Sequence, residues 1–241
     1  MSQQLNEFGQ PIGFDLPGWT PPPWPEKEPI EGRYCRLEPI DPERHASGLF
    51  AAITADADNS SWTYMPYGPF ETLESYVEWM RTKCLGNDPL FFAIVDLKTA
   101  LPVGVASYLR ITPASGFIEV GHLHFSSKLR RTPVATEAMY LMMKYAFGLG
   151  YRRYEWKCDT LNAPSRAAAQ RLGLSFEGIF RQATVYKQRT RDTAWFAAID
   201  ADWPDLKRAF EAWLDPNNFD DDGRQRISLS DLTRPLLKNR H

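Results

Sequence analysis

The chain has 241 residues, 43% hydrophobic and 24% charged, which suits one globular domain with additional segments or two small domains. Its net charge of −2 gives no general electrostatic reason to expect a nucleic-acid partner. The three cysteines have neither disulfide-framework nor zinc spacing, which indicates a reducing compartment. The N-terminus does not resemble a signal peptide and no stretch approaches the ~20 apolar residues of a membrane span, so we expect a cytoplasmic protein without a membrane partner.

Proline and aromatic residues dominate the first 30 residues, which cannot form a helix or a central strand because proline lacks a backbone donor. We predict an N-terminal arm at 1–30, and its two tryptophans favour an arm that lies against the domain over a free linker. The pattern then predicts, in chain order, a strand at 33–39, a helix from 42 to about Ala57 with Asp41 as its cap, an aromatic loop at 62–70 and a helix from 72 to 84.

The middle of the chain predicts three consecutive strands, at 91–96, 103–111 and 117–125. The clearest helix spans 132–149, where apolar residues recur at helical spacing before two glycines. A strand at 154–158, a short helix at 163–172, strands at 174–180 and 193–199, and a helix at 202–214 complete the series.

This order predicts an α/β (α+β) fold with a mixed, mostly antiparallel twisted sheet of about seven strands and helices on both faces. The first half supplies hairpins and the second half a β-α-β crossover. We expect the domain to span 31–200 and to be followed, at 201–241, by a C-terminal helix and a polar tail.

A basic loop precedes the helix that begins at Thr132-Pro133. A helix N-terminus carries unpaired N–H groups and about half a positive charge, which favours anions. Arg130 and Arg131 add side-chain donors suited to phosphate oxygens. This pattern predicts a pyrophosphate site, although a solvated basic loop is an equally good interpretation of these residues alone.

Three motifs stand in the second half of the chain: Arg-x-x-Pro-x-Ala-Thr-Glu-Ala at 130–138, Asn162-Ala163-Pro164-Ser165, and Arg171-Leu172-Gly173-Leu174 followed by Glu177-Gly178 and Arg181. Together they resemble the GNAT N-acetyltransferase superfamily and, more narrowly, its branch of ribosomal-protein N-terminal alanine acetyltransferases. The resemblance covers residues 32–199. It implies the GNAT fold, acetyl-coenzyme A (acetyl-CoA) as cosubstrate and acetyl transfer to an amine.

The chain departs from the family pattern at Pro133, where the branch has glycine. Proline suits the first helical position but has no N–H, so one backbone donor to the pyrophosphate is lost. We expect Arg130 and Arg131 to compensate.

The resemblance also implies which residues hold the cosubstrate. Backbone groups around 123–125 would contact the pantetheine and the oxyanion, the helix start would hold the pyrophosphate, Asn162 would bond the pantetheine arm, and Ser165 would protonate the leaving sulfur. The expected cosubstrate-binding residues are Leu123, His124, Phe125, Arg130, Arg131, Thr132, Val134, Ala135, Asn162 and Ser165. Asn162 and Ser165 are also interpretable as an ordinary helix cap and first-turn residue.

The reaction needs a base for the amine, and Glu119, eleven positions before Arg130, is the first candidate. A surface strand glutamate is the alternative. Strict alternation would place Glu119 with Leu123 and Phe125 on one face, opposite His122 and His124, unless a bulge reverses it. His122, with an ordinary pKa near 7, is the second candidate, against a packing role. No cysteine or carboxylate partner stands at metal-ligand spacing, so we expect no metal site.

The aromatic loop falls where GNAT enzymes build a variable amine site, so Trp62, Tyr64, Tyr67 and Phe70 are expected to bind the acceptor. A hydrophobic cluster beneath the loop is the alternative.

The leading hypothesis is an acyltransferase that moves acetyl directly from acetyl-CoA to a primary amine, as a monomer or homodimer. No activated nucleophile is evident, since Cys158 lies in mid-strand without a nearby histidine. A protein N-terminal α-amine and a small-molecule amine remain alternative acceptors. A non-catalytic acyl-CoA sensor or scaffold is the alternative function, and nucleic-acid binding is disfavoured.

Overall fold

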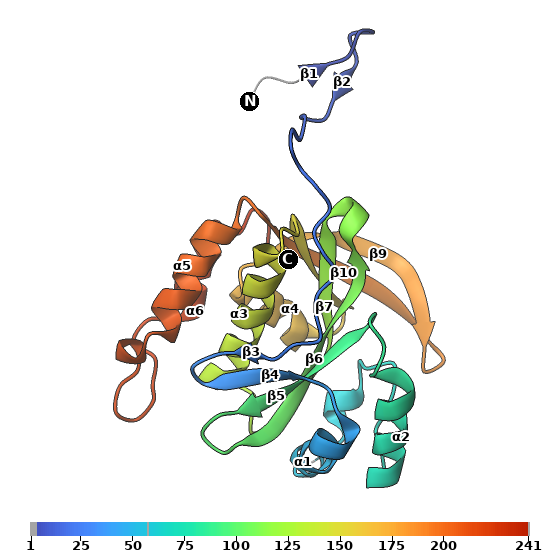
Figure 1. Ribbon diagram of the computed structural model, residues 1–241, viewed down its shortest axis with the longest axis vertical. Coiled ribbons are helices and arrows are strands. Elements are labelled where there is room, and N and C mark those ends of the chain that lie inside the picture. Colours follow the sequence, from blue (N-terminus) through green and yellow to red (C-terminus); the bar gives the residue numbers. More distant parts are fainter. Residues whose placement is uncertain (1–3, 57, 241) are drawn as a thin grey trace.

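One sheet of eight strands forms the centre of the molecule, in a computed structural model that describes residues 4–56 and 58–240 (Figure 1). The strands run in the order β3-β4-β5-β6-β7-β8-β10-β9, and every pairing is antiparallel except β7 with β8. Their bounds are Ile30–Glu31 (β3), Cys35–Pro39 (β4), Leu90–Asp96 (β5), Leu101–Thr112 (β6), Phe117–Phe125 (β7), Arg153–Asp159 (β8), Ser175–Tyr186 (β9) and Arg189–Ile199 (β10). The predicted fold class is confirmed. Eight strands replace about seven because the pattern does not reveal the two-residue β3.

Two helices cover one face of the sheet, over strands β5 and β6. Helix α1 (Pro42–Thr54) is capped by Asp41, and α2 (Leu73–Lys83) by a capping box of Thr72 and Ser75. Their apolar faces pack with the aromatic loop into one hydrophobic cluster. The expected end of α1, Ala57, lies outside the described residues.

The opposite face carries the larger core. Helices α3 (Pro133–Gly148), α4 (Ala163–Arg171) and α5 (Trp203–Leu214) pack there, with α3 against the centre of the sheet (Figure 1). Nine of the sixteen residues of α3 are buried, so it is almost apolar all round, as a helix between two layers must be. None of the helices in the described ranges is long and apolar enough to cross a membrane.

The segment after α5 folds back onto α4. It contains a short helix, α6 (Leu229–Thr233), and Leu229 and Thr233 are fully buried. The Thr233 hydroxyl donates to the backbone oxygen of Arg171, at the last residue of α4. The expected polar tail therefore contributes to the core, with its polar residues at the surface.

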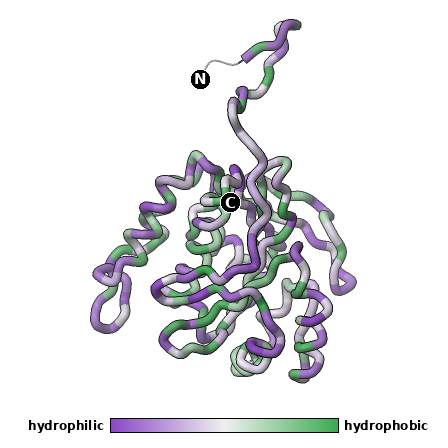
Figure 2. Tube along the Cα trace, viewed as in Figure 1, coloured by the Kyte–Doolittle hydropathy of each residue, from purple (hydrophilic) through white to green (hydrophobic). Residues whose placement is uncertain are grey.

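The N-terminal arm has two parts. Its first part forms a small hairpin of β1 (Gln4–Leu5) and β2 (Pro11–Ile12) that stands clear of the domain (Figure 2). This hairpin carries exposed apolar side chains. The second part lies along the domain, where the backbone oxygen of Pro23 accepts from Tyr151 and the Glu26 N–H donates to Tyr145. Residues 1–3 of the expected arm lie outside the described ranges.

A β-bulge in β7 overturns the expected alternation. Between two ladder positions β6 advances two residues, from Val105 to Ser107, whereas β7 spans three, from Gly121 to His124. The extra residue is accommodated at His122, whose φ is +50°. The expectation that Leu123 and Phe125 share a face with Glu119 is therefore wrong: they pack on the α3 side, while Glu119, His122 and His124 lie on the α1–α2 side.

A buried carboxylate fastens α3 to the start of the sheet. Glu137, 5% exposed, accepts three backbone N–H groups, from Arg33 at 2.8 Å, Tyr34 at 2.6 Å and Cys35 at 2.8 Å. The turn must come very close to make these bonds. A Cβ at Gly32 would lie 2.5 Å from the Glu137 carboxylate oxygen, so this position accepts only glycine without rearrangement.

Glu137→Gln should lower the free energy of unfolding by about 2–4 kcal/mol, because an amide keeps one acceptor and turns a donor toward N–H groups. Urea denaturation measures this loss. Glu78→Gln, at an exposed position on α2, is the matched control and should stay within about 0.5 kcal/mol of the parent. Equal stabilities for the two variants would show that the three bonds contribute nothing net.

Candidate active site

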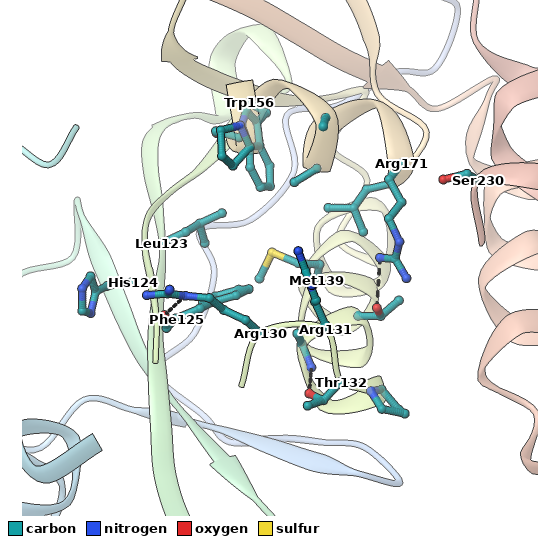
Figure 3. A pocket seen from close by; sticks show the side chains of 18 of the residues that line it. Leu123, His124, Phe125, Arg130, Arg131, Thr132, Met139, Trp156, Arg171 and Ser230 are labelled. Atoms are coloured by element: carbon teal, nitrogen blue, oxygen red, sulfur yellow. Dashed lines mark hydrogen bonds between the residues drawn. The ribbon is translucent and has the colours of Figure 1, made fainter. Parts of the chain in front are cut away.

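A cavity of about 1130 Å³ opens where β7 and β8 part (Figure 3). The parallel ladder between them ends at Val120 and Trp156. Beyond that point the end of β7, the start of α3 and the length of α4 surround the cavity, and residues after α5 close it. The β7 backbone edge that faces away from β6 is therefore turned toward the cavity.

The structure brings most of the expected cosubstrate residues to this one cavity. Those that line it are Leu123, His124, Phe125, Arg130, Arg131, Thr132, Ala135, Asn162 and Ser165. Val134 is not among the lining residues. The two base candidates, Glu119 and His122, also lie outside the lining, on the α1–α2 side of the sheet.

The start of α3 has fewer free donors than an ordinary helix N-terminus. Thr132 caps it, and its hydroxyl oxygen accepts from the Ala135 N–H at 3.3 Å. Pro133, at the first position, has no N–H. Val134 is thus left to donate from this turn, together with the positive end of the helix dipole.

The two arginines before α3 differ in their freedom. Arg130 donates to the Phe125 carbonyl at 2.8 Å and forms an ion pair with Asp56 at 2.8 Å, so it fixes the loop as well as adding charge. Arg131 is exposed, lines the cavity and has a φ of +63°. Arg131 is therefore the more available of the two to an anion.

A tryptophan–serine pair lies near the end of the shared β7–β8 ladder. The Trp156 Nε1–H donates to Ser165 Oγ at 3.0 Å, and Asn162 Oδ1 accepts from the Ser165 N–H at 3.1 Å. Asn162 is thus a cap for α4, as the simpler interpretation held, and still lines the cavity. Burial raises the pKa of the neighbouring Cys158 thiol, which keeps it protonated near neutral pH.

The aromatic loop packs mostly inward. Trp62, Tyr67 and Phe70 belong to the cluster between the sheet and α1–α2, where Trp62 stacks on His124 with ring centroids 3.9 Å apart. Tyr64 lines the cavity, and its hydroxyl donates to the Leu161 carbonyl at 3.0 Å. The loop therefore meets the cavity through Tyr64.

Glu119 is 3% exposed and has cationic neighbours, Lys157 Nζ at 3.0 Å and Arg110 Nε at 3.7 Å. Burial raises its pKa, opposed by the charge of Lys157. Burial lowers the pKa of His122 to about 4, below the value near 7 that its residue type suggests. The His122 ring bonds the Tyr67 hydroxyl through Nδ1 at 3.1 Å.

Sequence reasoning missed several lining residues. Trp156, Thr136 and Arg171 lie inside expected elements, but no pattern marks their direction; Arg171 does stand in the quoted motif. Trp213, Phe219 and Ser230 come from the region expected as terminal helix and polar tail. Within residues 4–56 and 58–240, no three His, Cys, Asp or Glu side chains gather as a metal ion would require.

Buried neutral histidines make a prediction for stability. Burial lowers the pKa of both His122 and His124 to about 4, against roughly 6.5 in an unfolded chain. Because these pKa values are depressed, the contribution of the two histidines to the free energy of unfolding is fully present above about pH 6.5. It is lost as the pH falls toward 4, because only the unfolded chain takes up the protons. Thermal melts from pH 7.5 to 4.5 should show this fall. His122→Asn, which tolerates the positive φ, should reduce it by on the order of 2 kcal/mol. An unchanged pH dependence in that variant would contradict the assignment.

Comparison with known proteins identifies the family. The model of the Acetyltransferase (GNAT) domain matches residues 35–175. The chain is 45% identical to a GCN5-related N-acetyltransferase from Brucella melitensis, over 91% of this chain and 100% of that one, with a TM-score of 0.89. It is 40% identical to a probable GNAT-family acetyltransferase from Chromobacterium violaceum, over 81% and 98% of the two chains, with a TM-score of 0.76.

A more distant structure, a putative ribosomal-protein-serine acetyltransferase from Vibrio cholerae, shares the fold at 19% identity, with a TM-score of 0.61 over 75% of this chain and 99% of that one. No curated protein sequence matches the chain. The family match and the two closer structures carry the assignment: the chain belongs to the GNAT family and is an acetyl-CoA-dependent N-acetyltransferase.

Proposed function

We propose that this enzyme transfers acetyl directly from acetyl-CoA to a primary amine, with the α-amine of a peptide N-terminus as the preferred acceptor. The observation that carries the proposal is the single cavity that runs from the start of α3 to the Trp156–Ser165 pair, past the parting of β7 and β8. An elongated ligand with an anionic middle and a reactive end suits these surroundings.

The residues present fit such a ligand. Thr132 and Arg131, which line the cavity, would hold the diphosphate through the helix dipole and a guanidinium, and the backbone N–H of Val134, which is not a lining residue, would add one donor. The free backbone edge of Leu123–Phe125 would bond the pantetheine amides and the carbonyl oxygen, as an added strand would. Acetyl-CoA supplies the acetyl group as a thioester, whose carbonyl carbon bonds the amine nitrogen while the carbon–sulfur bond breaks.

Ser165 would give its hydroxyl proton to the departing sulfur. Its oxygen already accepts the Trp156 N–H, which fixes the oxygen, and Cys158 is a second side-chain hydrogen-bond partner of the hydroxyl. The hydroxyl hydrogen would turn from Cys158 toward the sulfur of the bound thioester. The indole N–H would also stabilise negative charge that develops on Oγ before solvent returns the proton. The protonated, buried Cys158 thiol supports direct transfer over a covalent acyl-enzyme.

The base candidates favour an acceptor of low pKa. His122, with a pKa of about 4, is a weak base, and Glu119 is held by Lys157. An α-amine has a pKa of about 7.7–8.0, so much of it is already neutral near pH 8, whereas a lysine amine near 10.4 is almost fully protonated. We propose Glu119 as the base, acting through water from the α1–α2 side. The resemblance to N-terminal alanine acetyltransferases supports the same acceptor class.

Ser165→Ala should lower kcat by about 100-fold or more with a small change in the KM for acetyl-CoA, since a general acid typically contributes about 10²–10⁴-fold. Release of free thiol, measured against N-terminal peptides, lysine side-chain peptides and small polyamines, gives the rates. Ser47→Ala, at an exposed position on α1, is the matched control. A rate for Ser165→Ala equal to that control would remove the proton-donor role. If only polyamines are acetylated, the proposed acceptor is a small-molecule amine and not a peptide. If acetyl-CoA binds but no amine is acetylated, a non-catalytic acyl-CoA sensor is favoured.

Glu119→Gln and His122→Asn separate the two base candidates. If Glu119 is the base, Glu119→Gln should lower kcat at pH 7 by at least 10-fold and lose the acid limb of the rate profile between pH 6 and 9. His122→Asn should then keep the parent profile. The reverse outcome would assign the base to His122, and two unchanged profiles would assign proton removal to bulk water.

A further inference from the structure

One guanidinium in the cavity has no anionic partner among residues 4–56 and 58–240. Arg171, at the last residue of α4, donates from its Nη1 to the Thr136 hydroxyl at 3.1 Å, and no carboxylate of the described residues lies within ion-pair distance. Burial lowers its pKa below the ordinary value for arginine. A partly buried cation without a counter-charge is costly unless an anion joins it, so this position is suited to a negatively charged ligand.

The chain fixes Arg171 in place from two sides. Its guanidinium carbon lies 5.1 Å from the centre of the Trp213 ring, and its backbone oxygen accepts from the Thr233 hydroxyl at 2.9 Å. Both partners belong to the part of the chain beyond residue 175, where the family match ends. From outside the matched domain, Trp213 therefore contacts the side chain and Thr233 bonds the backbone, while Thr136, inside it, accepts from the guanidinium.

The C-terminal segment, residues 215–240, also closes the cavity beside Arg171. Phe219, Gln225 and Ser230 line it there, and Figure 3 shows Arg171 and Ser230 on the side opposite Leu123 and His124. Ser165 stands in the first turn of α4 and Arg171 in its last, a rise of about 9 Å along the helix. The cavity therefore has a reactive end at Ser165 and a cationic end at Arg171, where the guanidinium donates to Thr136 near the start of α3.

We propose that Arg171, held by Trp213 and the C-terminal segment, is a phosphate-binding residue for the nucleotide end of the cosubstrate. The inference rests on the proposed function, because a ligand with its thioester at Ser165 extends its phosphates toward Arg171. The ribose phosphate and the diphosphate of CoA could both make this contact, because two oxygens of either group can accept two parallel hydrogen bonds from the guanidinium. Such a contact replaces backbone donors that the α3 start lacks because of Pro133 and the Thr132 cap.

Calorimetric titration with two probes, CoA and 3′-dephospho-CoA, tests this without any turnover. Arg171→Gln should weaken CoA binding roughly 10- to 100-fold. If only CoA is weakened, the phosphate on the ribose is the partner; if both probes are weakened equally, the diphosphate is. Unchanged affinities for both probes would overturn the proposal.

Two further variants separate charge from shape. Arg171→Lys keeps the cation and the alkyl stem, so it should retain part of the affinity that Arg171→Gln loses and should fold if Arg171→Gln does not. Equal losses in both variants, with melting temperatures like that of the parent, would mean that Arg171 only shapes the cavity, and would also overturn the proposal. Arg208→Gln, on the exposed side of α5, is the control and should bind both probes like the parent. If the parent chain does not bind CoA, this would instead contradict the proposed function.

Discussion

The three bonds to the Glu137 carboxylate determine where the active-site helix stands. Glu137 lies one turn inside α3, and its acceptors hold the turn between β3 and β4. A buried carboxylate can be retained only if its oxygens are fully bonded, and here backbone donors do this, with no cationic side chain of residues 4–56 and 58–240 in an ion pair with it. Because the helix is rigid, fixing its second turn also fixes the position of Thr132 and Pro133 at the cavity. The Ala-Thr-Glu-Ala motif thus fixes α3 to the sheet, in addition to its place beside the proposed cosubstrate site.

The bulge in β7 supplies the second constraint. It gives the strand a local change of direction at His122, close to the point where the ladder to β8 ends. One consequence is an open backbone edge between two strands that neighbour each other at their other end. Another consequence is that Leu123 and Phe125 point to the α3 side of the sheet, while His122 and His124 point to the aromatic cluster. The bulge thus accounts both for the open strand edge at the cavity and for the distribution of these side chains over the two faces of the sheet.

The hydrophobic periodicity was sufficient to predict the fold class of this chain. It was insufficient to predict which face of the sheet the candidate site side chains point to. Helix α3 and the longer strands of the sheet, unlike the two-residue β3, are long enough for a repeating pattern to mark them. A positive φ at His122, a non-glycine residue, leaves no such pattern, so the side-chain parity beyond Gly121 could not be derived. The C-terminal segment was missed for another reason. Its buried residues, Asn218, Leu229 and Thr233, are few and scattered, and they pack by tertiary contacts that composition does not reveal.

Pro133 connects the departure from the family motif to the rest of the molecule. Loss of an N–H from the α3 start weakens a site made of backbone dipoles, whose strength depends on the number of donors aimed at one anion. Side-chain cations can restore that strength, but a mobile arginine loses entropy on binding and is screened by solvent. Arg130 is occupied by Asp56 and Phe125, and Arg131 is exposed. Arg171 is the cavity arginine that is both partly buried and positioned, since Trp213 and Thr233 hold it in place. An additional C-terminal segment is therefore a physically sufficient way to keep a phosphate site on a helix that begins with proline.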